Sequence, residues 1–377
     1  MKKLKCTMAA VLATAITVLT CGCSGADMTW SYKDDQTTLS IGTYIYYEYS
    51  AYQQASKKVS DSNGDFLSEE FTNDDDETMT ARDYIASETD LACKNYLNVE
   101  KKFSELGLSL TEEELAAAKQ NASSGWSYNK TLLEGYGVSQ ESFTNAYGVL
   151  SAKYEKIFRT MYGTGGEKAV SESDLSTYFT DNYTNYSYFS VPLYNSTTDE
   201  SGNAASTAKS DEDIAKIKTS LDTYAEAINK GEATFEDEAK AYMTDYNVTT
   251  DPSKSDVAVL ADSGLGDEVI TAYGEMSEKQ AQVIKVGTDN SKASYYFLYK
   301  APITDKASTL SSDSDLHYKV LVKMKAEDYI DYMNEAAKAV ECEKNQAAID
   351  KYGPEKFITY ATEPAASSSK TTSSSAQ

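Results

Sequence analysis

Cysteine and histidine are the side chains most often used for covalent and metal chemistry, and this chain holds few of them. There are five cysteines and one histidine, His317, in 377 residues. Two of the cysteines, Cys21 and Cys23, stand one glycine apart at the end of an apolar stretch. A thiolate metal site needs four ligands, usually with a second pair downstream, and the downstream residues supply only Cys93, Cys342 and His317. The spacing predicts no metal site, which leaves a redox pair or a processing signal.

The residues before this cysteine pair have the pattern of an export signal. Residues 1–5 carry three lysines, and residues 6–20 form an apolar run, shorter than the about 20 residues that span a bilayer. The following "TCGC" resembles the lipobox of bacterial lipoproteins, which implies cleavage after residue 22 and lipidation of Cys23. Two or three acyl chains on one cysteine would anchor the chain stably to the outside of the cell membrane. Cys21, which follows the larger Thr20, and an ordinary secretory cut at "SGAD" are the alternatives.

The net charge of the chain limits the molecules that it can bind. The net charge is -24, and loss of the three signal-segment lysines makes the mature chain about -27. Such a surface repels nucleic acid and anionic lipid headgroups, so we expect neither as a partner. The chain has 30 tyrosines against 10 phenylalanines, and tyrosine suits half-exposed grooves as well as cores. Cys93 and Cys342 lie in helix-like segments, and we expect them to be free thiols.

An acidic stretch at residues 60–77 imitates the beginning of a calcium loop. Its "DSNGD" is followed by Phe66 where such a loop requires glycine, and by Thr72 where it requires glutamate. We therefore expect a solvated loop without calcium. We expect no cofactor for the chain as a whole.

Helical periodicity dominates residues 43–185, after a short extended piece at residues 28–42. Helix starts are predicted at Ser109 or Thr111 and at Ser139, with a third in "VSESDLSTYFTDNY", and Gly107 ends the helix before the first of them. The same periodicity in residues 320–353 predicts one or two further helices that end near Gly353. The low-complexity tail at residues 363–377 cannot bury a core and is expected to be disordered.

From residue 186 to about residue 305 the pattern changes to that of a small α+β domain. The predicted order is strand, helix, helix, strand, helix, strand, strand. The strands are residues 186–195, 255–261, 281–287 and 293–302, the helices are residues 212–232, 234–245 and 267–277, and a polar loop covers residues 196–211.

Several phrases together resemble the extracytoplasmic foldases of the SurA and PrsA type. "ELGLSLTEEELAAA" and "YGVSQESFTNAY" are similar to passages of their chaperone region, and "INKGEATFEDEAKAYMTD" is similar to the helix phrase of their parvulin domain. The resemblance implies an α+β multidomain protein with a mainly helical SurA-N-like chaperone domain and a small parvulin-like domain. The implied segments are a signal peptide at 1–22, a helical domain at 23–185, a parvulin-like domain at 186–305, returning C-terminal helices at 306–360 and a disordered tail at 361–377.

Parvulins are peptidyl-prolyl isomerases, and this chain departs from their catalytic pattern. The family resemblance calls for two histidines, on the first and last strands, with a cysteine or aspartate between them. Here Phe189 and Ser190 stand at the first position, Tyr296 or Phe297 at the second, and the nearest aspartate is Asp256. His317 lies outside the domain and is expected to be an ordinary surface or helix-start residue. No catalytic residue is therefore assigned, and whether the chain is an isomerase stays open.

The apolar groove of a parvulin domain has counterparts in this sequence. By position, the resemblance implies that it is lined by Phe189, Leu265, Val269, Tyr273 and Tyr296. Such a groove holds an extended peptide by apolar contact and sheet-edge pairing.

Three functions compete. The leading one is a membrane-anchored extracytoplasmic chaperone or foldase that binds unfolded, newly exported polypeptides. The others are an active isomerase with a substituted site, and a lipoprotein that captures a solute or peptide.

Overall fold

The computed structural model describes residues 28–59, 65–73, 76–198 and 204–362. The chain divides into two compact units: unit 1 combines residues 1–157 with 332–377, and unit 2 is residues 158–331. The signal segment, Cys23, most of the calcium-like motif and nearly all of the tail lie outside the described residues. The units divide the chain at other positions than the predicted domains, whose boundaries stay a prediction. None of the described helices combines the length and the apolar character that crossing a bilayer requires.

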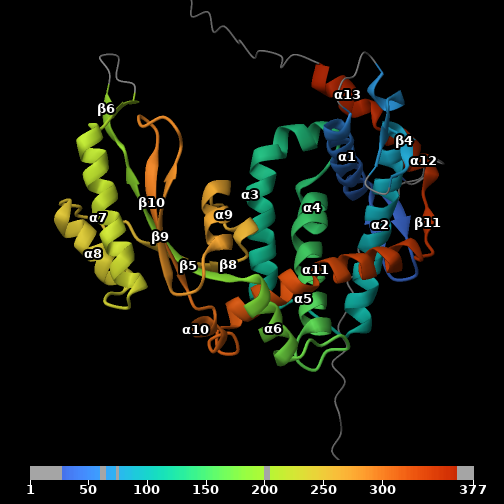
Figure 1. The fold of residues 1–377 in the computed structure, drawn as a ribbon. Coiled ribbons are helices and arrows are strands. Elements are labelled where there is room, and N and C mark those ends of the chain that lie inside the picture. Colours follow the sequence, from blue (N-terminus) through green and yellow to red (C-terminus); the bar gives the residue numbers. More distant parts are fainter. Residues whose placement is uncertain (1–27, 60–64, 74–75, 199–203, 363–377) are drawn as a thin grey trace, which may run out of the picture. The chain divides into compact units, whose positions relative to one another are not determined.

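Unit 1 consists mainly of helices, with short antiparallel strand pairs (Figure 1). Its strands are β1 (Trp30–Lys33), β2 (Thr38–Ser40), β3 (Glu70–Thr72), β4 (Thr78–Thr80) and β11 (Glu343–Lys344). Its helices are α1 (Ile41–Lys58), η1 (Phe66–Ser68), α2 (Ala81–Glu105), α3 (Glu112–Tyr136), α4 (Gln140–Phe143), η2 (Thr144–Val149), α12 (Gln346–Ile349), η4 (Asp350–Tyr352) and α13 (Glu355–Thr362). Two helices belong to both units in sequence, α5 (Leu150–Tyr162) and α11 (Ser314–Lys338).

Helix starts in unit 1 follow the capping signals of the sequence. The Thr111 hydroxyl accepts a hydrogen bond from the Glu114 backbone N–H, and the Glu114 carboxylate accepts one from the Thr111 N–H. This reciprocal capping box begins α3, so Thr111 and not Ser109 is the cap. Ser139 caps α4 in the predicted way, and Gly107 follows α2 with a φ of 65°, which suits glycine. These predicted boundaries are confirmed.

The helix that begins at Ser139 contains a wider turn that was not predicted. Residues 144–149 of η2 are π-helical, between α4 and α5. A side chain at Gly148 would place its Cβ 2.4 Å from the Ala118 carbonyl oxygen and 2.9 Å from the Ala122 Cβ. Glycine at this position therefore lets η2 approach the backbone of α3 directly.

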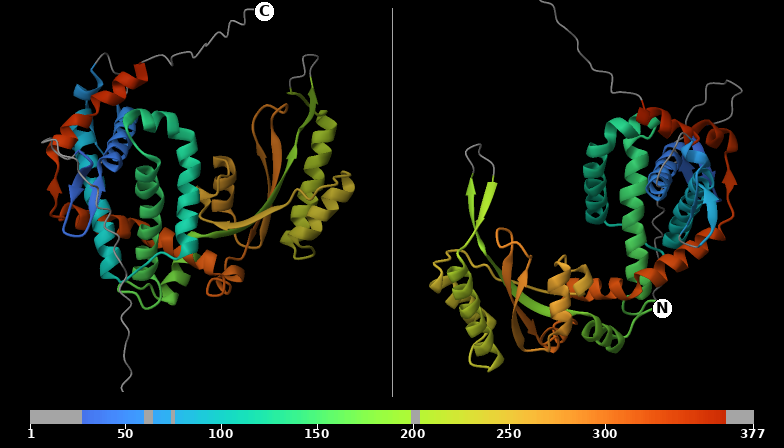
Figure 2. Two further views of the ribbon diagram at one scale, coloured as in Figure 1. Left: turned by 180° about the vertical axis from the view of Figure 1, so that it is seen from behind. Right: turned by 45° about the horizontal axis from the view of Figure 1, so that its top comes forward.

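The C-terminal segment of unit 1 packs against its N-terminal elements, as the red and blue ribbons show in Figure 2. Strand β11 pairs antiparallel with β1, with Lys344 opposite Tyr32. Farther on, the buried Phe357 ring lies with its centroid 5.4, 5.5 and 4.8 Å from those of Tyr49, Tyr52 and Tyr136. Residues about 300 positions apart in sequence thus share one aromatic core.

Two predictions for unit 1 were wrong in detail. Residues 70–80 contain the β3–β4 hairpin, inside a region expected to be loop and helix. Phe71 stabilises the hairpin because its ring packs edge-on against Tyr84 of α2, at 5.2 Å. The ordered chain also continues past Gly353, because α13 places Phe357 in the core.

Unit 2 contains a four-stranded antiparallel sheet in the order β8-β5-β10-β9 (Figure 1). Its strands are β5 (Thr184–Pro192), β6 (Tyr194–Thr198), β7 (Ala204–Ala208), β8 (Lys254–Ala258), β9 (Gln280–Val286) and β10 (Ser294–Ala301). Its helices are α6 (Glu172–Asn182), α7 (Asp211–Asn229), α8 (Phe235–Asp245), η3 (Leu260–Asp262), α9 (Asp267–Glu275) and α10 (Thr304–Ala307). The predicted order of strands and helices is confirmed. The polar loop was wrong in part, because its flanks pair as the β6–β7 hairpin.

The two faces of this sheet carry different cores because successive strand residues point to opposite faces. Phe189 and Val191 of β5 face α7 and α8. Tyr186 of β5 and Leu298 of β10 face α9. In Figure 1 the helix pair α7–α8 and helix α9 lie on opposite sides of the sheet.

The outer edge of β9 is capped at Ala281 by a side chain. The Asn229 amide donates from Nδ2 to the Ala281 carbonyl oxygen at 3.0 Å, and its Oδ1 accepts from the Ala281 N–H at 2.7 Å. Strand β8 forms the other edge, and no further described strand pairs with it. The backbone edge of β8 is therefore open to pairing.

Candidate functional site

The structure brings four of the five predicted groove residues to one face of the sheet. Leu265, Val269, Tyr273 and Tyr296 all belong to the cluster between α9 and the sheet. Val269 and Tyr273 are buried, and the Tyr273 hydroxyl donates to the Ser187 carbonyl oxygen at 2.8 Å. Only Leu265 and Tyr296 are partly accessible. Their role in holding a peptide stays a prediction.

Phe189 does not share that face. Its side chain is fully buried in the other core, with its ring 4.9 Å from that of Phe297 and 5.0 Å from that of Tyr242. Because strand residues alternate, a shift of one position moves a side chain to the opposite face. Tyr188, the neighbour of Phe189 in β5, lies on the α9 face together with Tyr186, and it stacks on Tyr296 at 6.1 Å.

The strand positions where parvulins carry histidines lie opposite one another in this sheet. Phe189 pairs with Phe297, and Ser190 with Tyr296. At these positions the phenyl rings of Phe189 and Phe297 lie on the α7–α8 face, and Tyr296 lies on the α9 face. The one histidine lies elsewhere in unit 2, as expected: His317 is in the first turn of α11, with Nε2 3.2 Å from a Glu172 carboxylate oxygen.

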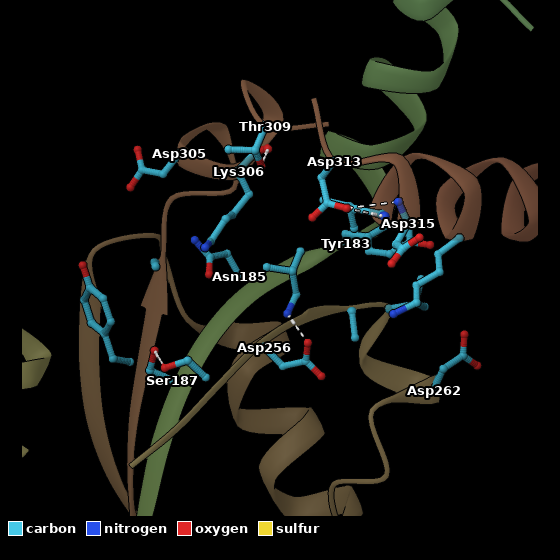
Figure 3. A pocket seen from close by; sticks show the side chains of 18 of the residues that line it. Tyr183, Asn185, Ser187, Asp256, Asp262, Asp305, Lys306, Thr309, Asp313 and Asp315 are labelled. Atoms are coloured by element: carbon cyan, nitrogen blue, oxygen red, sulfur yellow. Dashed lines mark hydrogen bonds between the residues drawn. The ribbon is translucent and has the colours of Figure 1, made fainter. Parts of the chain in front are cut away.

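A large open groove is lined in part by the α7–α8 face of the sheet, and Figure 3 shows its lining side chains. Its volume is about 870 Å³. The floor is formed by β5 (Asn185 and Ser187), β10 (Tyr299 and Ala301) and β8 (Ser255). The walls come from α8, from α10 and the residues after it, and from the start of α11. We call this site the β8 groove, because residues 255–259 all line it, so that the strand presents its backbone as well as one face.

Acidic side chains dominate the lining. Glu236, Asp256, Asp262, Asp305, Asp313 and Asp315 contribute six carboxylates against two lysines, Lys306 and Lys319. Three of the carboxylates have local partners. Asp313 accepts from the backbone N–H groups of Asp315 and Leu316, Asp256 accepts from the Val257 N–H, and Asp262 pairs with Lys323 at 2.8 Å.

The two tyrosines of the β8 groove remain neutral phenols. Burial, with the nearby Tyr178 and Asp262, raises the pKa of Tyr183 to about 12. Burial, with the carboxylates of Asp305 and Glu236, also raises the pKa of Tyr299. They therefore offer hydrogen bonds and ring surface, and no phenolate base.

The groove residues have no evident catalytic arrangement. The Ser187 and Ser255 hydroxyls lie 2.7 Å apart, but the lining includes no histidine or cysteine to activate either of them. Among the residues that the structure describes, no three His, Cys, Asp or Glu side chains are placed to hold a metal ion. The lining offers hydroxyl, amide and carboxylate groups that can bind a ligand through hydrogen bonds and charge.

Sequence patterns did not point to the β8 groove. Its residues come from the ends of strands that are distant in sequence and from α10, a helix of one turn. The one available signal was the crowding of aspartates at residues 305–315, which is also what a helix start requires.

Comparison with known proteins adds little. No protein-family model matches the chain, and no curated protein matches it. Among solved structures, the foldase protein PrsA from Lactococcus lactis aligns with 87% of this chain and 98% of its own chain, at 13% identity and a TM-score of 0.30. That likeness is too weak to carry an argument about function, which rests on the chain's own residues.

Proposed function

We propose that this protein is a lipid-anchored extracytoplasmic foldase that holds extended, positively charged segments of exported polypeptides without catalysing rotation about prolyl bonds. The observation that carries the proposal is the β8 groove, an open channel beside an edge strand.

The shape and lining of the groove favour a polypeptide over a small molecule. Small-molecule pockets are mostly apolar and enclose their ligand. The β8 groove is open, and hydroxyl, amide and carboxylate groups line much of it. An extended peptide can satisfy such groups along its length and can pair with the exposed edge of β8.

Charge favours basic segments. Six carboxylates and two lysines give the groove a net negative lining, and the whole chain carries -24. A negative cleft raises the local concentration of cationic ligands and speeds their association. Lysine-containing and arginine-containing stretches of an unfolded chain fit this field best.

The expectation that the domain does not catalyse isomerisation rests on the side chains available. An isomerase must favour the twisted imide over the planar one, against a barrier of about 18–20 kcal/mol. In this domain the corresponding strand positions hold Phe189, Ser190, Tyr296 and Phe297. Phenyl rings cannot supply the polar groups that this preference requires, and the hydroxyls of Ser190 and Tyr296 have no imidazole beside them.

The anchor is a separate part of the proposal. We expect Cys23→Ala to release the chain from the membrane fraction, and metabolic labelling with a radioactive fatty acid to mark the unmodified chain but not the variant. If Cys21→Ala and not Cys23→Ala abolished labelling, the cleavage position would be wrong.

The decisive experiment measures peptide binding by the mature chain from Ser24 onward. Fluorescence anisotropy should show saturable binding of an unstructured lysine-rich peptide, and much weaker binding of its glutamate-rich counterpart. The double variant Asp305→Lys with Asp315→Lys should weaken binding about fivefold to tenfold, because two exposed charges beside the ligand change sign.

A matched control changes the same charge elsewhere. The variant Glu232→Lys with Asp331→Lys alters two exposed carboxylates that do not line the groove, and it should bind as the unmodified chain does. Equal weakening in both variants would mean that only net charge matters. An accelerated proline-limited refolding phase at catalytic concentration would establish isomerase activity and overturn the non-catalytic reading.

A further inference from the structure

One carboxylate of the β8 groove is bonded to the edge strand itself. The Asp256 side chain accepts a hydrogen bond from the backbone N–H of the next residue, Val257, at 2.7 Å (Figure 3). Because each backbone N–H is a single donor, the one at Val257 is directed away from β5 and toward the open side of the strand. This bond identifies the backbone groups that form the outer edge of β8.

Backbone groups alternate in direction along an antiparallel pair of strands. Since β5 is the one described strand that pairs with β8, every second residue, Ser255 and Val257, presents its N–H and C=O groups to the open edge. These groups are the ladder that an added strand would use. Of the two N–H donors in this ladder, the one at Val257 is already occupied by Asp256.

Asp256 reaches this donor from the α9 side of the sheet. Its register partner in β5 is Tyr186, which belongs to the cluster between α9 and the sheet. Residues directly opposite one another share a face, so the Asp256 side chain leaves the strand on that side and its carboxylate bends across the edge. Asp256 is exposed, so the carboxylate can move away without disturbing a core.

An arriving strand has to displace this carboxylate. A ligand carbonyl oxygen would accept from the Val257 N–H, and the ionised Asp256 would lose its donor. A ligand side chain opposite Asp256 is within reach, because opposite Cβ atoms lie about 4.5–5.5 Å apart. A lysine or arginine there replaces the lost hydrogen bond with a charge-assisted one, whereas an uncharged side chain replaces it weakly. The neighbouring ligand residues point the other way, into the groove.

We infer that Asp256 makes edge pairing with β8 selective for extended segments that carry a basic residue opposite it. An uncharged strand meets an occupied donor, and a basic strand frees that donor by binding its occupant. The inference rests on the proposed function for the source of the segment, and it adds the position that selects it. The same carboxylate keeps the edge from pairing indiscriminately, as charges on edge strands generally do.

The test uses two short β-prone peptides that differ at two adjacent central positions, which hold lysine in one peptide and glutamine in the other. Adjacent residues point to opposite faces, so one lysine can meet Asp256 while the other meets the groove. Fluorescence anisotropy with the mature chain from Ser24 onward should show about tenfold tighter binding of the lysine peptide. Amide hydrogen exchange should show protection of the Val257 N–H by the bound peptide.

Substitution of Asp256 separates its two effects. Asp256→Ala removes the occupant, so the glutamine peptide should bind about threefold to fivefold more tightly and the lysine peptide about threefold less tightly. Asp256→Asn keeps an acceptor for the Val257 N–H without the charge, so it should weaken lysine-peptide binding and leave glutamine-peptide binding unchanged. The control is Asp305→Ala, at an exposed groove carboxylate on another element, which should weaken lysine-peptide binding without helping the glutamine peptide.

The contrary outcomes are distinct. If Asp256→Ala did not tighten binding of the glutamine peptide, the side chain would not guard the edge. A Val257 amide left unprotected by bound peptide would place the ligand elsewhere. An increase in light scattering as the one effect of Asp256→Ala would mean that the side chain merely keeps copies of the chain apart. In each case, lysine-peptide binding that still responded to Asp305→Lys with Asp315→Lys would leave the proposed function standing, whereas no binding of either peptide would overturn both.

Discussion

The two units differ in how completely their buried polar side chains are hydrogen-bonded. In unit 2 the hydroxyls of Tyr224, Tyr246 and Tyr273 donate to Asp245, to Ser220 and to a backbone carbonyl. In unit 1 the Tyr47 hydroxyl, one oxygen of the buried Glu48 and the Asn95 Oδ1 have no partner in the described structure, whereas unit 2 has one such buried atom, the Asn290 Oδ1. Satisfied polar groups fix a core in one arrangement, whereas unsatisfied ones store energy that protonation or a ligand can release. The comparison predicts pH sensitivity for unit 1, because there one of the unpartnered atoms belongs to an ionisable side chain, Glu48.

The largest effect that sharpens this comparison concerns Glu48. Tyr44 donates to its Oε1 at 3.2 Å, but burial, with the nearby Glu355, raises the Glu48 pKa to about 8 from an ordinary value near 4.5. Between these two values the folded chain holds a proton that the unfolded chain has lost. The free energy of unfolding therefore falls as pH rises through this range and levels off above about pH 8.

The variant that tests this pH dependence is Glu48→Gln, which cannot gain or lose the proton. One pKa unit corresponds to about 1.4 kcal/mol, so the unmodified chain should lose about 4 kcal/mol between pH 5 and pH 8 through this group. Glu48→Gln should abolish that loss, whereas Glu141→Gln, at an exposed position, should keep it. Urea unfolding at several pH values measures the free energy of unfolding of both variants. A pH profile that is identical in the two variants would remove Glu48 as the cause.

The next effect tests the packing of the π-helical turn. Gly148→Ala should lower the free energy of unfolding by about 1–3 kcal/mol, because its Cβ would overlap the Ala118 carbonyl in a tightly packed interface. Gly274→Ala in α9 is the control, since nothing lies within 4 Å of its added Cβ. Unchanged stability of Gly148→Ala in thermal unfolding would mean that η2 can shift without loss.

A smaller effect is expected in the satisfied core of unit 2. Tyr273→Phe removes the donor to the Ser187 carbonyl and should cost about 1–2 kcal/mol, with no change in pH dependence. Denaturant unfolding at pH 6 and pH 8 measures it. A new pH dependence in this variant would contradict the contrast between the units.

The smallest expected change in stability concerns Asn229, which caps the edge of β9 at Ala281. Asn229→Ala removes both hydrogen bonds to Ala281 and should lower stability by about 1 kcal/mol. It also opens a strand edge, so it should increase self-association in light scattering at high protein concentration. Asn182→Ala, whose amide binds only within its own helix, should not do so.

Local signals in the sequence were sufficient for most elements and insufficient for the sites. Capping residues such as Thr111 and Ser139 act within one turn, so the helix starts they define could be predicted. Phe189 was assigned to the wrong face because strand periodicity does not reveal which face meets which helix. The β8 groove could not be predicted, because it joins residues from elements far apart in sequence.

The pairing of β1 with β11 has a consequence for the order in which the chain can fold during its synthesis. The sheet of unit 1 needs residues 343 and 344, and the aromatic core around Tyr49 and Tyr136 needs Phe357. Unit 2 ends at residue 331, so all of its sequence is present before unit 1 can close. Contacts of such long sequence separation form slowly. A nascent chain paused before residue 343 would carry a complete unit 2 and an N-terminal half whose tyrosines still lack their last partner.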